Sequence, residues 1–155
     1  THHCVCMPGQ IQRYMNKISG PLLDRIDIQV EITPVPFKDI SQAAQGESSS
    51  VIRERVIRAR HMQEQRFKEV KGIYSNAQMT ERMIHQFAEP DAEGIELLRT
   101  AMERLSLSAR AYNRILKVAR TIADLEQSET VKSQHLAEAI SYRNLDRGDW
   151  AERGN

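Results

Sequence analysis

The spacing of apolar residues changes along the chain near residue 33. Over residues 26–32, an apolar side chain stands at every second position, which is the pattern of a β-strand. These apolar residues are Ile26, Ile28, Val30 and Ile32. A short helical pattern over residues 8–18 precedes the strand. A single strand cannot satisfy its own backbone groups, so we expect its partners to lie in protein outside this chain.

After residue 33 the apolar spacing becomes helical, once Pro34 and Pro36 have ended the strand and a polar stretch has passed. Helices are expected at about 51–71, 81–88 and 92–105, then along residues 112–125 and 136–140. Their expected caps are Ser50, Asp91, Ser108 and Ser133. The long first helix should bury one side, formed by Ile52, Val56, Ala59, Gln63, Phe67 and Val70. The fold class is therefore mainly α.

Composition supports helix packing and narrows the class of protein. Hydrophobic residues make up 40% of the 155 residues and aromatic residues only 5%, which suits aliphatic helix packing. The 22 basic and 21 acidic residues nearly cancel, so any nucleic-acid surface must be local. No apolar run approaches the roughly 20 residues needed to cross a bilayer. The start of the chain has no signal-peptide pattern, and we expect a cytoplasmic protein cut from a longer one.

Arg25 is the first candidate functional residue. It stands between a Gly-Pro turn and the expected strand, where a guanidinium can reach a phosphate on a neighbouring subunit. The alternative is an intramolecular salt bridge with Asp24 or Asp27.

Arg110 is the second candidate. It falls two positions after the expected cap Ser108, in a first helical turn that already favours an anion. A cation there is unfavourable for the helix, which suggests a function. The alternative is a solvated arginine with little energetic consequence.

Cys4 and Cys6 are the third candidate, with His2 and His3 beside them. Thiolates suit zinc, but a structural zinc site needs four ligands, usually from two separated clusters. Only one cluster is present, so reduced thiols in a disordered segment are the alternative.

Several blocks of sequence together resemble the magnesium-chelatase-related AAA+ ATPase family of competence proteins (ComM/YifB). The resemblance covers nearly the whole chain and is specific. Its main blocks are Cys4 to Tyr14, Ile18-Ser19-Gly20-Pro21-Leu22-Leu23-Asp24-Arg25-Ile26-Asp27, Leu107-Ser108-Ala109-Arg110-Ala111-Tyr112, Arg114 to Leu125, and His135-Leu136-Ala137-Glu138-Ala139-Ile140.

The resemblance implies a domain organisation and roles for the candidate residues. Residues 1–32 become the end of an AAA+ core, 33–50 a linker, 51–145 a helical lid and 146–155 a tail. Arg25 is placed as an arginine finger acting in trans, and Arg110 as the sensor-2 residue that contacts the γ-phosphate of ATP. An upstream Cys-Pro-Cys element of the family would complete a zinc site with Cys4 and Cys6.

The resemblance also implies partners and an activity. Family members are expected to assemble as homo-oligomers, with a hexamer as the expected form, that use ATP and Mg²⁺ to drive DNA branch migration during recombination. This chain has no Walker A or Walker B element, so we expect no hydrolysis from it alone. Basic positions on helix 51–71 suit phosphate contacts, although a solvated or intersubunit face is the simpler interpretation. Chelatase-type or protein-remodelling ATPases, or a non-enzymatic helical module, are the alternatives.

Overall fold

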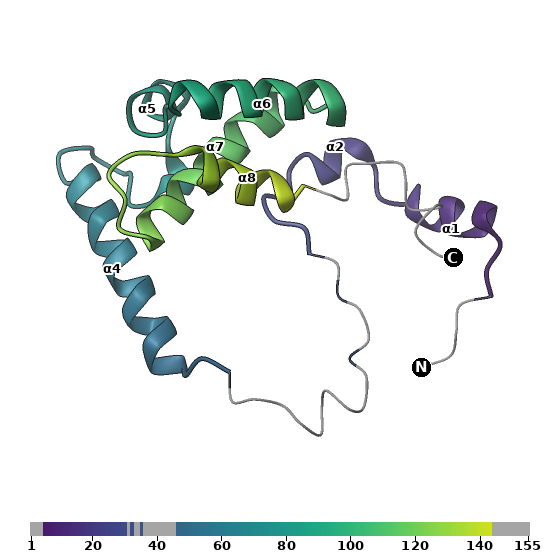
Figure 1. Ribbon diagram of the computed structural model, residues 1–155, viewed down its shortest axis with the longest axis horizontal. Coiled ribbons are helices and arrows are strands. Elements are labelled where there is room, and N and C mark those ends of the chain that lie inside the picture. Colours follow the sequence, from purple (N-terminus) through teal and green to yellow (C-terminus); the bar gives the residue numbers. More distant parts are fainter. Residues whose placement is uncertain (1–4, 31, 33–34, 36–45, 144–155) are drawn as a thin grey trace.

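The computed structural model describes residues 5–30, 32, 35 and 46–143, and within them the chain is helical (Figure 1). The expectation of a mainly α fold is thus confirmed. The tail 146–155 and most of the linker 33–50 lie outside the described residues. The helices are α1 (Pro8–Met15), α2 (Gly20–Leu23), α4 (Ser49–Phe67), the 3₁₀ turn η1 (Asn76–Gln78), α5 (Glu81–Phe87), α6 (Ala92–Leu105), α7 (Ala109–Leu125) and α8 (Ser133–Ser141).

Helix α7 lies at the centre of the bundle and contacts α4, η1, α5 and α8, while α6 packs on α8 (Figure 1). Its sequence explains this place, because small residues recur along its buried side at Ala111, Ala119 and Ala123. Small side chains let neighbouring helices approach closely. Gly94 has the same effect between α6 and α8, since a Cβ there would lie 2.6 Å from the Leu136 side chain.

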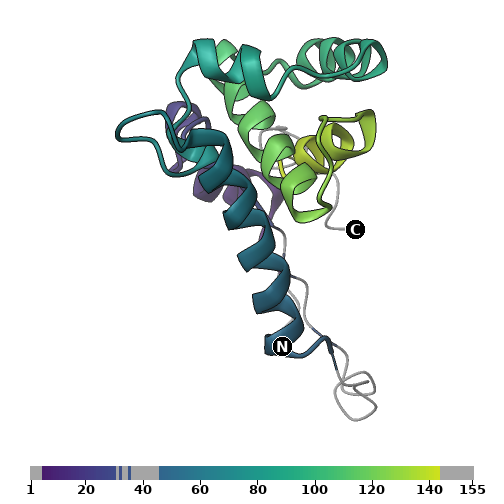
Figure 2. The same ribbon diagram turned by 90° about the vertical axis from the view of Figure 1, so that its left-hand side faces the viewer.

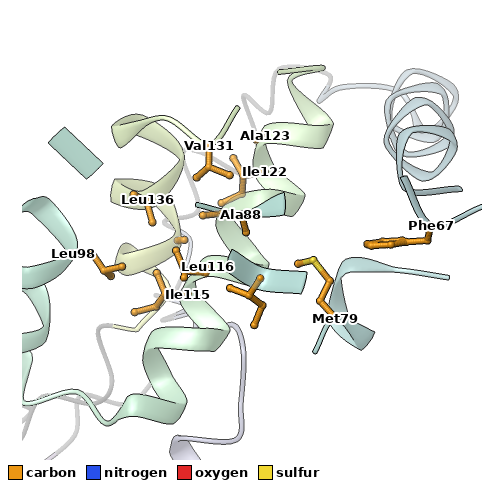
Figure 3. Packing of buried hydrophobic residues seen from close by; sticks show 13 residues of the cluster. Phe67, Met79, Ala88, Leu98, Ile115, Leu116, Ile122, Ala123, Val131 and Leu136 are labelled. Carbon is orange, nitrogen blue, oxygen red and sulfur yellow. The ribbon is translucent and has the colours of Figure 1, made fainter. Parts of the chain in front are cut away.

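The apolar core gathers side chains from every helix around α7 (Figure 3). Leu98 of α6 and Leu136 of α8 meet Ile115 and Leu116 of α7, and each is at most 2% exposed. At the other end of the core, the rings of Phe67 and Phe87 meet edge to face with centroids 5.8 Å apart. This core orients the first turn of α7 relative to the rest of the bundle.

A buried carboxylate, Asp124, organises the polar part of the interior. It is fully buried, and Arg66 of α4 donates two hydrogen bonds to it, at 2.8 and 2.5 Å. Arg120, itself 1% exposed, donates through Nε at 3.1 Å, and Asn76 of η1 donates at 2.7 Å. Burial lowers the pKa of Arg120, while the charge of Asp124 opposes that shift.

The same cluster fixes the loop that follows α7. Arg120 donates to the backbone carbonyls of Ser128 and Glu129, the latter at 2.8 Å. Asn76 also donates to Thr121 at 3.1 Å, and its backbone amide donates to Gln63 at 3.2 Å. One carboxylate and its donors therefore join α4, η1, α7 and the loop before α8.

The strand predicted at 26–32 does not form in the residues of this segment that the structure describes. No residue that the structure describes belongs to a strand, and residues 26–30 have no regular secondary structure, with a bend at Asp27. Ile28 and Val30 are 52% and 62% exposed, whereas Gln29 between them is 7% exposed. Gln29 is buried because its amide donates to the Tyr142 carbonyl at 2.9 Å and its side chain donates to the Leu23 carbonyl at 3.3 Å. These hydrogen bonds thus bury the polar side of the segment and leave its apolar side exposed.

The long helix α4 differs from its prediction at both ends. Its N-cap is Ser48, whose hydroxyl accepts from the Val51 amide, in place of Ser50. The helix ends at Phe67, before the turn at Gly72, where φ is +83°. Of the predicted apolar side, Ala59, Gln63 and Phe67 are buried, whereas Ile52, Val56 and Val70 are exposed. The first half of α4 extends away from the other helices in both views, which leaves its apolar residues exposed (Figures 1 and 2).

The other caps follow the sequence more closely. Asp91 and Ser108 accept from the third residue after them, as predicted for α6 and α7. Helix α8 is different, because its N-cap is Lys132 and not Ser133. The buried His135 replaces a hydroxyl cap: its Nδ1 accepts from the Lys132 amide at 2.9 Å. The proton is then on Nε2, which donates to Glu126 at 2.9 Å and lowers the pKa of that carboxyl.

Replacing the central carboxylate should destabilise the whole bundle. Asp124→Asn keeps the shape of the side chain but leaves the buried Arg120 and the partly buried Arg66 without their counter-charge, which costs about 3 to 5 kcal/mol of unfolding free energy. Urea unfolding of the 155-residue chain measures the loss. Glu96→Gln, which removes an exposed partner of Arg99, is the matched control and should barely change the midpoint. Equal effects of the two substitutions would contradict the role given to Asp124.

Candidate functional site

Arg25 follows α2 and is exposed. The helical turn continues past α2, because the Arg25 amide donates to the Leu22 carbonyl at 2.9 Å. Its guanidinium donates to the Pro21 carbonyl at 2.6 Å, and the described residues give it no carboxylate partner. The predicted alternative, a salt bridge to Asp24 or Asp27, does not form. Asp24 lies 3.7 Å from Arg143, and Asp27 pairs with Arg114.

Arg110 stands at the second position of α7, a helix of 17 residues. The Ser108 hydroxyl accepts from the Ala111 amide at 3.2 Å, so the first turn begins where the sequence predicts. No acidic residue occurs in that turn. Arg110 is exposed, and among the described residues it has neither a hydrogen bond nor an ion pair. An exposed cation without a described partner therefore stands at the positive end of a helix dipole.

An ion pair brings the two predicted segments together. Arg114 lies one turn after Arg110, on the same side of α7. It pairs with Asp27, which is two residues after Arg25. The segment that carries Arg25 therefore lies against the helix that carries Arg110, although no contact between those two side chains occurs in the described part of the chain.

Lys117 continues this side of α7. Its ammonium donates to the Ala77 carbonyl at 2.8 Å. Burial lowers its pKa, and the neighbouring charge of Arg114 adds to the decrease, while Asp27 opposes it. Lys117 and Asp27 also border an apolar groove of 460 Å³ between residues 27–30 and helices α7 and α8. The groove was missed by sequence reasoning, because its walls come from residues more than eighty positions apart.

The structure does not test the predicted zinc site at Cys4 and Cys6. Cys4 lies outside the described residues, and Cys6 is exposed. The described residues contain no group of three or more side chains able to hold a metal ion. Zinc binding by Cys4 and Cys6 therefore stays a prediction. The same part of the chain contains no helix long and apolar enough to cross a membrane.

Comparison with known proteins connects the two halves of this arrangement. The family model for the C-terminal part of magnesium chelatase subunit ChlI matches residues 46–143, and the model for the ChlI subunit itself matches residues 1–40. The chain belongs to the magnesium-chelatase-related family. Arg25 thus falls in the part matched by the ChlI model, and Arg110 in the part matched by the C-terminal model.

Relatives in this family match almost the whole chain. The uncharacterized protein YifB of Escherichia coli (strain K12) is 43% identical over 147 residues, which are 94% of this chain and 28% of YifB. The competence protein ComM of Haemophilus influenzae is 38% identical over 139 residues, 89% of this chain and 26% of ComM. An uncharacterized protein of Mycobacterium tuberculosis (strain H37Rv) is 36% identical over 140 residues, 90% of the chain and 27% of that protein. This family member thus spans little more than a quarter of its relatives' length.

The charge of Arg110 should reduce the stability of the bundle slightly. Arg110→Gln removes an unfavourable interaction with the helix dipole, so the unfolding free energy should rise by a few tenths of a kcal/mol. Ser108→Ala in the same turn should lower it by about 1 kcal/mol, because a cap is lost. Thermal unfolding of the unsubstituted chain and the two variants measures both changes in unfolding free energy. A clear loss of stability in Arg110→Gln would mean that Arg110 has a structural role.

Proposed function

We propose that this chain is the nucleotide-responding C-terminal part of an AAA+ ATPase. Arg110 contacts the γ-phosphate of ATP bound to its own subunit, and Arg25 reaches the ATP of a neighbouring subunit. The observation that carries this proposal is the exposed Arg110 at the start of α7, without an acidic partner among the described residues. Membership of the magnesium-chelatase-related family supports a related ATPase.

The chemistry of both arginines fits a nucleotide polyphosphate. A guanidinium is planar, permanently charged and able to donate two parallel hydrogen bonds to phosphate oxygens. At Arg110 the free amide groups and dipole of the first turn add to the attraction for an anion. ATP with Mg²⁺ supplies the phosphoryl group to be transferred, and this chain's arginines stabilise the charge that develops on it.

The lack of an acidic partner does not by itself distinguish Arg25 and Arg110 from the other exposed arginines. Other exposed arginines also have no hydrogen bond or ion pair within the described part of the chain; they include Arg53, Arg58, Arg60, Arg82 and Arg104. Arg110 differs because it occupies the N-terminus of a long central helix. Arg25 differs because the residues on both sides of it are bonded to the bundle.

We further propose that the complete protein is a cytoplasmic homo-oligomer, a hexamer, that drives branch migration of DNA. The exposed half of α4 supports this with Arg53, Arg58 and Arg60, whereas Arg55 pairs with Glu47. These three charges suit phosphate contacts that do not depend on base sequence.

A protein-remodelling or chelatase-type ATPase is the second candidate. It is favoured by the apolar residues beside those arginines, because Ile52, Val56 and Ile57 are 41%, 45% and 57% exposed. Apolar side chains gain little from a phosphate backbone and are buried well by another protein.

Replacing Arg25 in the full-length protein tests the ATPase proposal. Arg25→Ala should lower the rate of ATP hydrolysis by about 10³-fold or more, since an arginine finger is worth that much, while the affinity for ATP stays the same. Arg104→Ala removes another exposed, unpaired arginine and is the matched control. Mixing subunits that lack the ATP-binding loop but keep Arg25 with Arg25→Ala subunits should restore part of the rate. Unchanged hydrolysis in Arg25→Ala would refute the proposed role.

The DNA proposal has its own test on α4. Replacing Arg53, Arg58 and Arg60 together by Gln in the full-length protein should weaken binding of branched DNA. It should also reduce the slope of log affinity against log salt concentration by about 0.9 per lost phosphate contact. A variant with Arg13, Arg82 and Arg104 replaced by Gln loses the same three charges at other exposed positions and controls for the general loss of charge. If affinity and slope match the control, α4 does not bind DNA, and the second candidate gains support.

A further inference from the structure

Arg143 follows the C-terminal end of α8 and is almost completely buried, with 1% of its surface exposed. Its Nη1 donates to the Ile26 carbonyl at 2.6 Å. Its Nη2 lies 3.7 Å from a carboxylate oxygen of Asp24. Asp24 and Ile26 are the two neighbours of Arg25 in the chain. One buried guanidinium thus holds the backbone on one side of Arg25 and the side chain on the other.

Two further contacts extend this attachment along the segment. The Gln29 amide donates to the carbonyl of Tyr142, the residue before Arg143, at 2.9 Å. Asp27 pairs with Arg114 of α7. The residues that surround Arg25 are therefore fixed to α7 and to the end of α8, while the Arg25 side chain is exposed and bonded only to the Pro21 carbonyl within the described residues.

From this arrangement we infer that Arg143 is a positioning residue for Arg25. It fixes the Arg25 segment to the bundle, so that Arg25 and Arg110 move as parts of one body. This inference rests on the proposed function, in which the two arginines contact the ATP of different subunits. A shift of α7 that follows the nucleotide bound to one subunit then carries Arg25 relative to the ATP of the next subunit.

The chemistry of Arg143 explains why the position needs arginine. A buried cation requires partners for its charge and its donors, and the planar guanidinium reaches a backbone carbonyl and a carboxylate in two directions at once. Lysine has a single ammonium and cannot hold both neighbours in the same geometry. An arginine finger must be held closely in place, because a displacement of about 1 Å is enough to reduce the rate by about 100-fold.

The test uses the full-length protein with Arg143→Met and Arg143→Lys. Each should lower the rate of ATP hydrolysis by about 10- to 100-fold, with less loss for lysine, while the affinity for ATP changes by less than about twofold. In an Arg25→Ala background, Arg143→Met should cause no further loss, because both residues act through one step. Arg99→Met, which removes an exposed ion-paired arginine of α6, is the control and should leave the rate unchanged.

A structural measurement separates this inference from the proposed function. Hydrogen exchange of the peptide 22–30 should become faster in Arg143→Met, whereas peptides of α6 should exchange as before. Unchanged exchange at 22–30 would overturn the inference. So would a double variant, Arg25→Ala with Arg143→Met, whose loss of rate equals the product of the two single losses. If Arg25→Ala itself keeps full activity, the proposed function fails, and the exchange data still report whether Arg143 holds the segment. Should Arg143→Met fail to fold, Asp24→Asn weakens the same ion pair by removing the carboxylate charge. It must lower the rate and speed the exchange at 22–30 in the same way, to a smaller extent.

Discussion

The fold depends on one buried charge interaction, the contact of Asp124 with Arg66 and Arg120. A carboxylate without exposure to water is stable only when its charge is compensated and its oxygens are bonded, and here two guanidinium groups and an amide do this. The partners come from α4, η1 and α7, and Arg120 also holds the loop that leads to α8. The direction of α7, and with it the place of Arg110, follows from this cluster.

The arginines of the bundle thus divide into two groups by environment. Arg66, Arg120 and Arg143 are buried or nearly so; Arg66 and Arg143 are bonded to partners distant in the sequence, and Arg120 to Asp124 and to the loop after α7. Arg25 and Arg110 are exposed and without acidic partners in the described part of the chain. The first group stabilises the helical bundle, and the side chains of the second group are accessible to a ligand. Arg143 connects the groups, since it holds the residues on either side of Arg25.

Much of the helical bundle could be predicted because its helices are amphipathic and capped by local signals. The bounds of α6 and the caps Asp91 and Ser108 depend on residues within one turn of each other. The predictions failed where distant contacts decide. Gln29 is buried against α8 and turns its strand-like neighbours outward, and the apolar start of α4 lacks a covering surface among the described residues. Asp124 and Arg120 were part of an ordinary helical pattern, and nothing local distinguishes a buried charge from a solvated one.

In the proposed function, Arg25 and Arg110 belong to nucleotide sites completed by other parts of the assembly. A structure of the full-length protein with Mg²⁺ and a non-hydrolysable ATP analogue tests it most directly. We predict that nitrogen atoms of Arg110 from one subunit and Arg25 from its neighbour lie about 2.7 to 2.9 Å from phosphate oxygens of the same nucleotide. Both arginines turned away from the nucleotide, or paired with carboxylates of the core, would contradict the account.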